Sequence, residues 1–456
     1  MDNSNSSAGS LVIVNVRLPY ADQEKAAQRW MVECLDGLIT KITSFQPEES
    51  LANPPWTSVD ANGSLMLPSL CHSHIHLDKC FILDRCGELV NGDFSEAMRV
   101  TNEAKANFAL DTDDLYGRGN RLIRESIENG VTAMRAHVEV DTTVKFTCLD
   151  VGLALQAKYQ PVSDIQVAVF AQEPLFVASG DTTPGPNFYL LEEAIKREGV
   201  TVVGSAPYVE ATVELAKRNI ALIFEIARLQ SIELIDFHLD YNLDPTSEPL
   251  IYEVITQMKC CYENPVTVYR PRISIGHATR LQLFTPEEWQ GLVNSIGDLP
   301  ITFISLPQSD IYMQGRAEKD TTLGPPRGTL RVPYLARKYG LQVAMSVNNV
   351  ENAFTPQGSL DPLSLCTFGA AIFQAVIPED LRALTRSVTL TSKLAMGMKE
   401  TPVDLVPSVG NPADFVIIHG NYTLQSAVLN PGYERTTIRA GSVVATRRCM
   451  TTLFIR

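Results

Sequence analysis

The sequence predicts an α/β protein that combines a (β/α)8 barrel of the TIM type with a small β-sandwich domain built from both chain ends. Two observations indicate this fold. Eight apolar runs alternate with amphipathic helical stretches through the middle of the chain, and segments with strand character lie before and after them. Near-continuous apolar strands, each followed by a helix, suit a parallel sheet that is covered on its outer face. When such a sheet closes, the active site lies at the C-terminal ends of the strands.

The first segment of the chain predicts a small sheet. Residues 1–10 are polar and are expected to form a disordered tail without a signal peptide. Residues 11–67 have strand character, in which Asp36-Gly37 and Asn62-Gly63 predict hairpin turns.

The barrel is predicted from the eight apolar runs that follow. They are Met66–His76, Val131–Val138, Ile165–Gln172, Val200–Pro207, Ile232–His238, Arg272–His277, Ile301–Leu306 and Leu341–Asn348. Helices are predicted between them, among others over Asp113–Glu128, Leu190–Arg197, Ala211–Leu229, Glu287–Ser295 and Thr329–Tyr339.

The last part of the chain returns to strands after a helix predicted over Glu379–Met398. Gly410–Ile418 and Thr436–Arg447 have strand character. We therefore expect residues 11–67 and 399–456 to form one composite β-sandwich domain, and residues 68–398 to form the barrel with the active site.

Composition limits the partners. The chain has 456 residues, a formal net charge of −14 and a pI of about 5.1. Nucleic acids and anionic membrane surfaces repel an acidic protein, so we expect neither as a partner and expect a small, neutral or cationic molecule as substrate. No apolar run reaches the roughly 20 residues of a membrane-spanning helix. The nine cysteines contain no Cys-x-x-Cys pattern, which favours a cytoplasmic location, and an acidic barrel of this size is compatible with a homo-oligomer.

The histidines predict a metal site. His74 and His76 are one residue apart at the end of the first run, so in a strand both rings point to one face. His137, His238 and His277 each close a separate run and would meet them at one rim of the barrel. Neutral imidazole is the commonest protein ligand for a first-row metal.

These motifs together resemble the amidohydrolase superfamily, and within it the cytosine deaminase branch, which includes N-isopropylammelide-type aminohydrolases. The matching segments are HIHLDK (74–79), GVTAMRAHVEVD (130–141), VFAQEP (169–174), VVGSAP (202–207), IDFHLD (235–240), SIGHATRL (274–281), MQGR (313–316) and GNPADFVI (410–417).

The resemblance implies one catalytic Zn²⁺ or Fe²⁺. Its ligands would be His74, His76, His238 and the strand-8 position, which is Asn348 here. The resemblance also implies that His277 touches the metal-bound water or the substrate. Gln172 would contact the ring of a heterocyclic substrate.

Two carboxylates of the pattern are missing. Tyr241 stands where the branch ordinarily has a proton-shuttling glutamate, and Asn348 and Asn349 replace one or two aspartates. An amide can offer an oxygen to a metal, but it carries no charge and accepts no proton, so we expect metal binding to be weakened or lost. A tyrosine with a reference pKa near 10 is a poor proton shuttle at neutral pH.

Other polar residues could take over these roles. Asp240 follows His238 and is a candidate base, so the predicted catalytic set is His277, Tyr241, Asp240 and Asn348. The predicted substrate-binding set is Gln172, Lys79, His137 and Asn349. Asp78 is expected to bind a backbone amide or a ligand histidine.

Three functions remain open at this point. The first is a metal-dependent hydrolase that cleaves a C–N bond of a small cyclic amidine, amide or aminated heterocycle. The second is a non-hydrolytic isomerase, cyclase, decarboxylase or lyase on the same barrel, with an altered or absent metal. The third is a catalytically inactive binding homologue. The sequence does not name the substrate.

Overall fold

A computed structural model of the chain describes residues 10–46, 57–263, 268–315 and 328–454. The predicted tail lies outside the described residues, apart from Ser10, which begins the first strand. Residues 316–327 also lie outside them.

Eight parallel strands form the barrel, in the order in which they follow one another along the chain. They are β6 (Leu70–His76), β7 (Val131–Glu139), β8 (Asp164–Ala171), β9 (Val200–Ser205), β10 (Leu234–Leu239), β11 (Arg272–His277), β12 (Ile301–Ser305) and β13 (Val343–Met345). A parallel bridge between Ile75 and Asn348 joins the last strand to the first. The predicted barrel is therefore confirmed.

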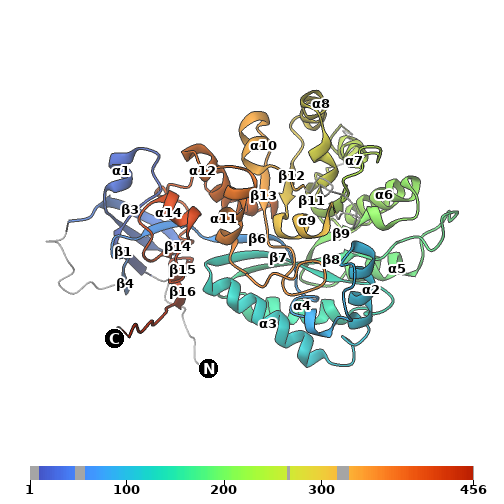
Figure 1. Cartoon of the computed structure of the whole chain (residues 1–456), viewed down its shortest axis with the longest axis horizontal. Coiled ribbons are helices and arrows are strands. Elements are labelled where there is room, and N and C mark those ends of the chain that lie inside the picture. Colours follow the sequence, from blue (N-terminus) through green and yellow to red (C-terminus); the bar gives the residue numbers. More distant parts are fainter. Residues whose placement is uncertain (1–9, 47–56, 264–267, 316–327, 455–456) are drawn as a thin grey trace.

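Helices follow the strands and cover the outside of the barrel (Figure 1). They are α2 (Phe94–Lys105), α3 (Thr112–Glu128), α4 (Thr147–Tyr159), α5 (Pro186–Ala194), α6 (Val213–Leu229), α7 (Ile251–Glu263), α8 (Pro286–Ile296), α9 (Pro307–Met313), α10 (Val332–Tyr339), α11 (Pro362–Ile372), α12 (Pro378–Ser387) and α13 (Leu390–Ala395). Short 3-10 helices span Leu83–Arg85, Pro207–Val209 and Thr279–Leu283.

Strands from both chain ends form two four-stranded sheets beside the barrel, seen in blue and red at the left of Figure 1. The first sheet has the order β3-β2-β1-β4 and the second the order β16-β15-β14-β5. Their strands are β1 (Ser10–Val16), β2 (Trp30–Leu35), β3 (Leu38–Ser44), β4 (Thr57–Asp60), β5 (Leu65–Pro68), β14 (Phe415–Ile418), β15 (Arg435–Arg439) and β16 (Ser442–Arg447). Two short helices accompany them, α1 (Gln23–Ala27) and α14 (Leu424–Leu429).

The two sheets share one apolar core, and this core joins the ends of the chain. Ile13 and Val32 of the first sheet lie in the same buried cluster as Met66 and Phe415 of the second. Antiparallel pairing of β5 with β14 places Leu67 opposite Val416. The small sheet domain of the prediction is confirmed, whereas its residue boundaries remain a prediction.

Two local expectations were wrong. The first predicted barrel strand, Met66–His76, is two strands, because the chain leaves the second end sheet at Pro68 and enters the barrel at Leu70. Asn62-Gly63 is a turn with positive φ angles of 50° and 71°, but it closes no hairpin, because β4 pairs with β1 and β5 pairs with β14. Asp36-Gly37 does close the predicted hairpin between β2 and β3.

Polar contacts fix the second end sheet to the barrel. Both guanidinium ends of the buried Arg435 bind the Asp361 carboxylate, at 2.7 and 2.6 Å, and Arg435 also donates to the carbonyl of Asn129. Thr437 donates to the carbonyl of Ile127 at 2.6 Å. These carbonyls end α3, so the sheet satisfies acceptors that a helix leaves free.

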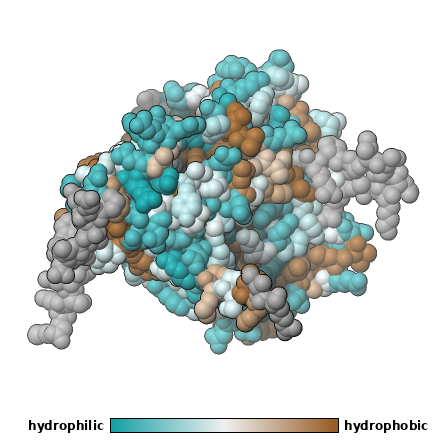
Figure 2. Space-filling model, turned by 60° about the vertical axis from the view of Figure 1, so that its left-hand side comes forward, coloured by the Kyte–Doolittle hydropathy of each residue, from teal (hydrophilic) through white to brown (hydrophobic). Residues whose placement is uncertain are grey.

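The face drawn in Figure 2 is mostly hydrophilic, with hydrophobic residues in separate patches. No helix within the described residues is long and apolar enough to cross a membrane.

Candidate active site

The predicted site histidines gather at the C-terminal end of the barrel strands. His74 and His76 end β6, His238 lies near the end of β10, and His277 ends β11; all are buried. The ring centre of His74 lies 5.6 Å from that of His76 and 4.3 Å from that of His238, and the centres of His76 and His238 are 5.1 Å apart. Three strands, β6 and the neighbouring pair β10 and β11, therefore supply one cluster.

Glycine at position 276 allows the His74 ring to enter this cluster. A β-carbon at Gly276 would lie 2.7 Å from Cε1 of His74, closer than real side chains approach. Any larger residue would push the ring out of its position. The glycine next to His277 is thus part of the site, although it contributes no functional group.

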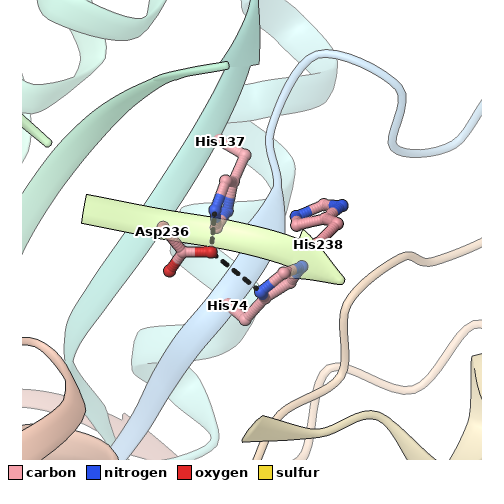
Figure 3. Close-up of side chains that lie close together, drawn as sticks. All are labelled: His74, His137, Asp236 and His238. Carbon is pink, nitrogen blue, oxygen red and sulfur yellow. Dashed lines mark ion pairs between the residues drawn. The ribbon is translucent and has the colours of Figure 1, made fainter. Parts of the chain in front are cut away.

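Asp236 is a site residue that the sequence reasoning missed. It lies on β10 two residues before His238, so both side chains point to one face of the strand. Its Oδ1 is 3.3 Å from Nε2 of His137 and 3.7 Å from Nδ1 of His74, and Figure 3 shows the carboxylate between these rings. Its Oδ2 is 2.8 Å from Arg135. In IDFH (235–238), polar residues alternate with apolar ones, and this alternation is the sequence signal that could have identified Asp236.

The charge of Asp236 follows from these contacts. Burial by itself would raise its pKa, but His137, His74 and Arg135 outweigh burial and lower the pKa below the usual range. The ionised carboxylate, 3.7 Å from Nδ1 of His74, favours the tautomer with the N–H at Nδ1, which leaves Nε2 of this ring as a possible ligand atom.

The ring nitrogens of the cluster fit a metal ion. Burial lowers the pKa of His74, His76 and His238 well below the usual value, so the rings are neutral. Both nitrogens of His74, Nδ1 of His76 and Nε2 of His238 are buried without a hydrogen-bond partner. Buried polar atoms are normally paired, and neutral imidazole nitrogens are metal ligands, so this cluster has the chemistry of a divalent metal site.

Two separate groups of ligand atoms are close enough to hold an ion. The ligand atoms of His74, His137, Asp236 and His238 lie within 4.8 Å of one another, and so do those of His76, Asp78 and Glu139. The predicted histidine ligands are thus divided between the two groups.

Asn348 lies beside the cluster, at the end of the strand that closes the barrel. Its backbone N–H donates to the carbonyl of His74, and its carbonyl accepts from His76. Its Nδ2 donates to Ser309 at 2.8 Å, while its Oδ1 is buried without a partner. The amide therefore presents an oxygen, the one atom with which an asparagine can bind a metal.

His277 is held by a carboxylate that the sequence reasoning did not identify. Its Nδ1 is 2.8 Å from Oδ1 of Asp310, and Thr329 donates to the same carboxylate at 2.5 Å. Burial raises the pKa of Asp310, against the opposing effect of His277. The ring of Tyr241 packs against that of His277 with 3.8 Å between ring centres. Asp310 belongs to α9, a short helix in a segment where no sequence pattern distinguished it.

A small cavity lies against the cluster. Its volume is about 20 Å³, enough for one water molecule and far below the roughly 150 Å³ that holds a benzene ring. Eight predicted residues line it: His76, Lys79, Gln172, His238, Tyr241, His277, Asn348 and Asn349. The rest of the lining consists of three aromatic residues that were not predicted, Phe94, Tyr208 and Phe354. The structure therefore brings most of the predicted site together around a small space.

Three predicted residues, His74, His137 and Asp240, do not line this cavity. His137 faces Asp236, and its contact with substrate stays a prediction. The Asp240 carboxylate accepts from the backbone N–H groups of Leu250 and Ile251 at 2.7 and 3.2 Å. Burial raises the pKa of Asp240 to about 7, while these N–H groups lower it. Asp240 thus holds the start of α7, and its role as a base stays a prediction.

Lys79 enters the cavity from a buried network of charges. Its Nζ is 2.8 Å from Oε1 of Glu139 and 3.2 Å from Oε1 of Gln172. Lys105, which the sequence reasoning missed, binds the other oxygen of Glu139 at 2.6 Å and Asp141 at 2.7 Å. The predicted structural role of Asp78 agrees with its contact to the backbone N–H of Glu139 at 2.6 Å.

Comparisons with known proteins support the fold. No protein-family model matches the chain. The N-isopropylammelide isopropyl amidohydrolase of Pseudomonas sp. (strain ADP) is 20% identical over 390 residues, which cover 85% of this chain and 87% of that protein.

Solved structures show the same architecture. The 5-methylcytosine deaminase of Klebsiella pneumoniae, liganded with 5-fluorocytosine, has a TM-score of 0.81 and 23% identity, covering 97% of this chain and 99% of that chain. An adenosine deaminase of Xanthomonas campestris with bound zinc has a TM-score of 0.63 and 14% identity, covering 98% and 95%. The resemblance predicted from the motifs is thus confirmed at the level of the fold.

Proposed function

We propose that this protein is a metal-dependent hydrolase that cleaves a C–N bond in a small cyclic amidine, amide or aminated heterocycle. The observation that carries the proposal is the cluster of buried, neutral histidines with unpaired nitrogens at the C-terminal ends of the barrel strands. The similarity to a 5-methylcytosine deaminase and to an N-isopropylammelide amidohydrolase supports this reaction class.

We propose that His74, His76 and His238 hold the ion, with Oδ1 of Asn348 as a neutral fourth group. Zn²⁺ is our first choice and Fe²⁺ the second, because the donors are imidazole nitrogens and the adenosine deaminase of the same fold has bound zinc. When bound, such an ion lowers the pKa of a coordinated water and polarises the group under attack.

His277 is our candidate for proton transfer in place of the missing glutamate. Asp310 accepts from Nδ1 of this ring at 2.8 Å, which directs the free nitrogen Nε2 away from Asp310. Nε2 can take a proton from the attacking water and return it to the leaving nitrogen. Tyr241, packed on the imidazole, keeps this ring in place and excludes water from one of its faces.

Metal analysis tests the proposal. Protein purified without chelator should contain Zn or Fe close to one per chain, and His74→Ala and His238→Ala should each remove it. His419→Ala is the matched control, because this histidine lies in the end sheets and contacts Thr436. The loaded protein should then release ammonia or an amine from at least one of a panel of aminated pyrimidines and triazines. A folded parent without metal, even after incubation with Zn²⁺, would refute the proposal.

A non-hydrolytic reaction is the second candidate. The observation that favours it is the cavity lining, in which Tyr241 and Asn348 stand where the pattern has carboxylates. Isomerisation, cyclisation, decarboxylation or elimination could use His277 as acid and base. Conversion of a substrate by the loaded protein without release of ammonia or amine would favour this candidate. Absence of any turnover would favour the binding homologue.

We also propose a cytoplasmic location and a homo-oligomer. The support for the location is that all nine cysteines are free. Light scattering at several protein concentrations tests the association.

A further inference from the structure

The polar groups around the cavity are unbalanced in charge. None of the described residues that line it carries a carboxylate, and Lys79 is the one cationic side chain among them. Glu139 and Asp141 lie behind Lys79 and are shared with the ammonium of Lys105. A ligand in the cavity therefore meets one charged donor, the Lys79 ammonium, and the carboxylate paired with it, Glu139, lies behind it and outside the lining.

Lys79 is fixed so that its ammonium remains at the cavity. Glu139 and Gln172 accept two of its three N–H bonds, and Nζ lies 5.1 Å from the centre of the Phe354 ring. Within the part of the chain that the structure describes, no partner takes the third N–H bond. The side chain is only 2% exposed, so this charge is placed by the fold and is not a mobile surface charge.

Gln172 adds a second donor beside the ammonium. An ammonium accepts no hydrogen bond, so the amide must turn its oxygen toward Lys79, and its Nε2 then points elsewhere. This Nε2 is buried beside the Tyr208 hydroxyl and makes no hydrogen bond of good geometry, in a residue that is 5% exposed and lines the cavity. Two adjacent donors of this kind match the two oxygens of a carboxylate.

Aromatic rings form the remaining walls. The ring centre of Phe94 lies 5.8 Å from that of Tyr208, 5.9 Å from that of Tyr241 and 5.7 Å from that of Phe354. Such walls favour a flat ring between them, because aromatic pairs gain from both burial and stacking.

We propose that the substrate is a planar cyclic compound with a carboxylate on its ring, and that Lys79 Nζ and Gln172 Nε2 bind this carboxylate. The assignment deepens the proposed function by giving its substrate class, and for the reaction it rests on that function. It replaces the neutral or cationic substrate expected from the net charge of −14, because charges beyond about 8 Å are screened and the cavity lining decides.

Binding of nicotinate and nicotinamide tests the assignment. The two probes share ring and size and differ in charge, and calorimetry on chelator-treated protein removes any contribution of a metal. Nicotinate should bind about 10- to 100-fold more tightly than nicotinamide, the range for charge-assisted hydrogen bonds. Lys79→Met should bring the ratio close to one. Lys41→Met, a substitution of an exposed lysine in the end sheets, should leave it unchanged.

A second variant covers the case in which Lys79→Met does not fold. Gln172→Glu keeps the size of the side chain and places a negative charge at the proposed carboxylate position, so it should reverse the preference toward nicotinamide. Equal binding of the probes to the parent would overturn the assignment. So would a nicotinate preference that requires Zn²⁺ and survives Lys79→Met, because the metal would then hold the carboxylate.

The same experiment separates this assignment from the proposed function. A Lys79-dependent preference for nicotinate in a protein that never binds Zn²⁺ would refute the hydrolase and leave the carboxylate site in place. The opposite result is Zn²⁺ binding with release of ammonia from uncharged heterocycles only, together with equal binding of the two probes. It would support the hydrolase and overturn the carboxylate site.

Discussion

Asn348 has a free oxygen where a carboxylate would give a metal ion a charged ligand. Its Oδ1 is buried without a partner, and its Nδ2 donates to Ser309 at 2.8 Å. Asn348→Asp keeps the size of the side chain, and the Ser309 hydroxyl can turn to donate to the new carboxylate. We expect Zn²⁺ to bind more than about tenfold more tightly, because a charged oxygen replaces a neutral one in a buried site.

Competition with a chelator of known affinity measures this change. Asn349→Asp is the control, because it adds the same charge at the next residue, which also lines the cavity. An equal gain in both variants would show that general electrostatic attraction acts, and that Asn348 is not a ligand.

Glu139 should make stability depend on acid pH. Burial by itself would raise its pKa, but Lys105 and Lys79 outweigh burial and lower the pKa to about 2, from 4.5. A carboxyl with a lowered pKa stabilises the fold fully above pH 4.5, and this stability is lost as the pH falls toward 2. The whole effect is on the order of 3 kcal/mol. Urea unfolding with chelator present, between pH 5.5 and 3, should show this slope in the parent.

Glu139→Gln should reduce the slope and lower the stability at pH 7, since two buried ammonium groups then lose their charged partner. Glu103→Gln, at an exposed position of α2, should keep the slope of the parent. Identical slopes in Glu139→Gln and the parent would show that Glu139 does not keep its low pKa.

Residues that act through partners were the least predictable from sequence. His74 and His76 could be predicted from strand periodicity, because residues two positions apart share one face of a strand, and the structure brings their rings together. Asp236 shares that periodicity, but its partners His137 and His74 come from other strands. Asp310 meets His277 across 33 residues, a contact that only tertiary packing determines. Asp240 stays a predicted base, and its proximity in sequence to His238 did not reveal the backbone N–H groups that hold it.

At the scale of the element, α2 closes the cavity. Phe94 at its start packs with Tyr208, Tyr241 and Phe354, while Lys105 at its end is held by Glu139 and Asp141. A cavity of about 20 Å³ admits no ring, so a cyclic ligand requires this wall to move. The aromatic contacts at the start of the helix are easier to separate than the buried ion pairs at its end.

Phe94→Ala should therefore speed the association of nicotinate, because it removes the side chain that closes the wall. Stopped-flow measurements of the observed rate against ligand concentration test this, with an expected gain of about tenfold or less. Leu89→Ala is the control, because Leu89 packs in the same apolar cluster without lining the cavity. Equal rates in the parent and Phe94→Ala would show that another element admits the ligand.

Strands were easier to predict than helices, for a physical reason. A strand buried on both faces is a continuous apolar run, as in β7, where every residue is buried. Helices α4, α7 and α11 were not named by the sequence analysis, and α11 is apolar on most of its surface, which hides the helical period. The single helix expected over Glu379–Met398 is α12 and α13, with a break around Val388 and Thr389.

At the scale of the whole molecule, the two chain ends form one unit that packs on the barrel. The pattern of strands at both ends predicted the unit, but the register of β5 against β14 could not be predicted, because it depends on residues about 350 positions apart. The polar contacts between the end sheets and the barrel could not be predicted from the sequence either. Arg435 and Asp361 are 74 residues apart, and no local pattern marks either one.

Arg435 should be among the most costly residues to replace. It is 1% exposed and makes two hydrogen bonds to Asp361 and one to the carbonyl of Asn129. Arg435→Met would leave the Asp361 carboxylate, whose side chain is only 16% exposed, without its cation. We expect a loss of about 3–5 kcal/mol of unfolding free energy, the range for breaking a buried ion pair from one side.

The double variant Arg435→Met with Asp361→Asn should recover part of this loss. The amide oxygen of asparagine can still accept from Leu363 at the start of α11, and no unpaired charge remains. Chemical denaturation of the parent, both single variants and the double variant gives the coupling energy directly. Arg448→Met, at an exposed position near the end of the chain, should change stability by less than about 0.5 kcal/mol. A loss just as small in Arg435→Met would show that apolar packing alone joins the end sheets to the barrel.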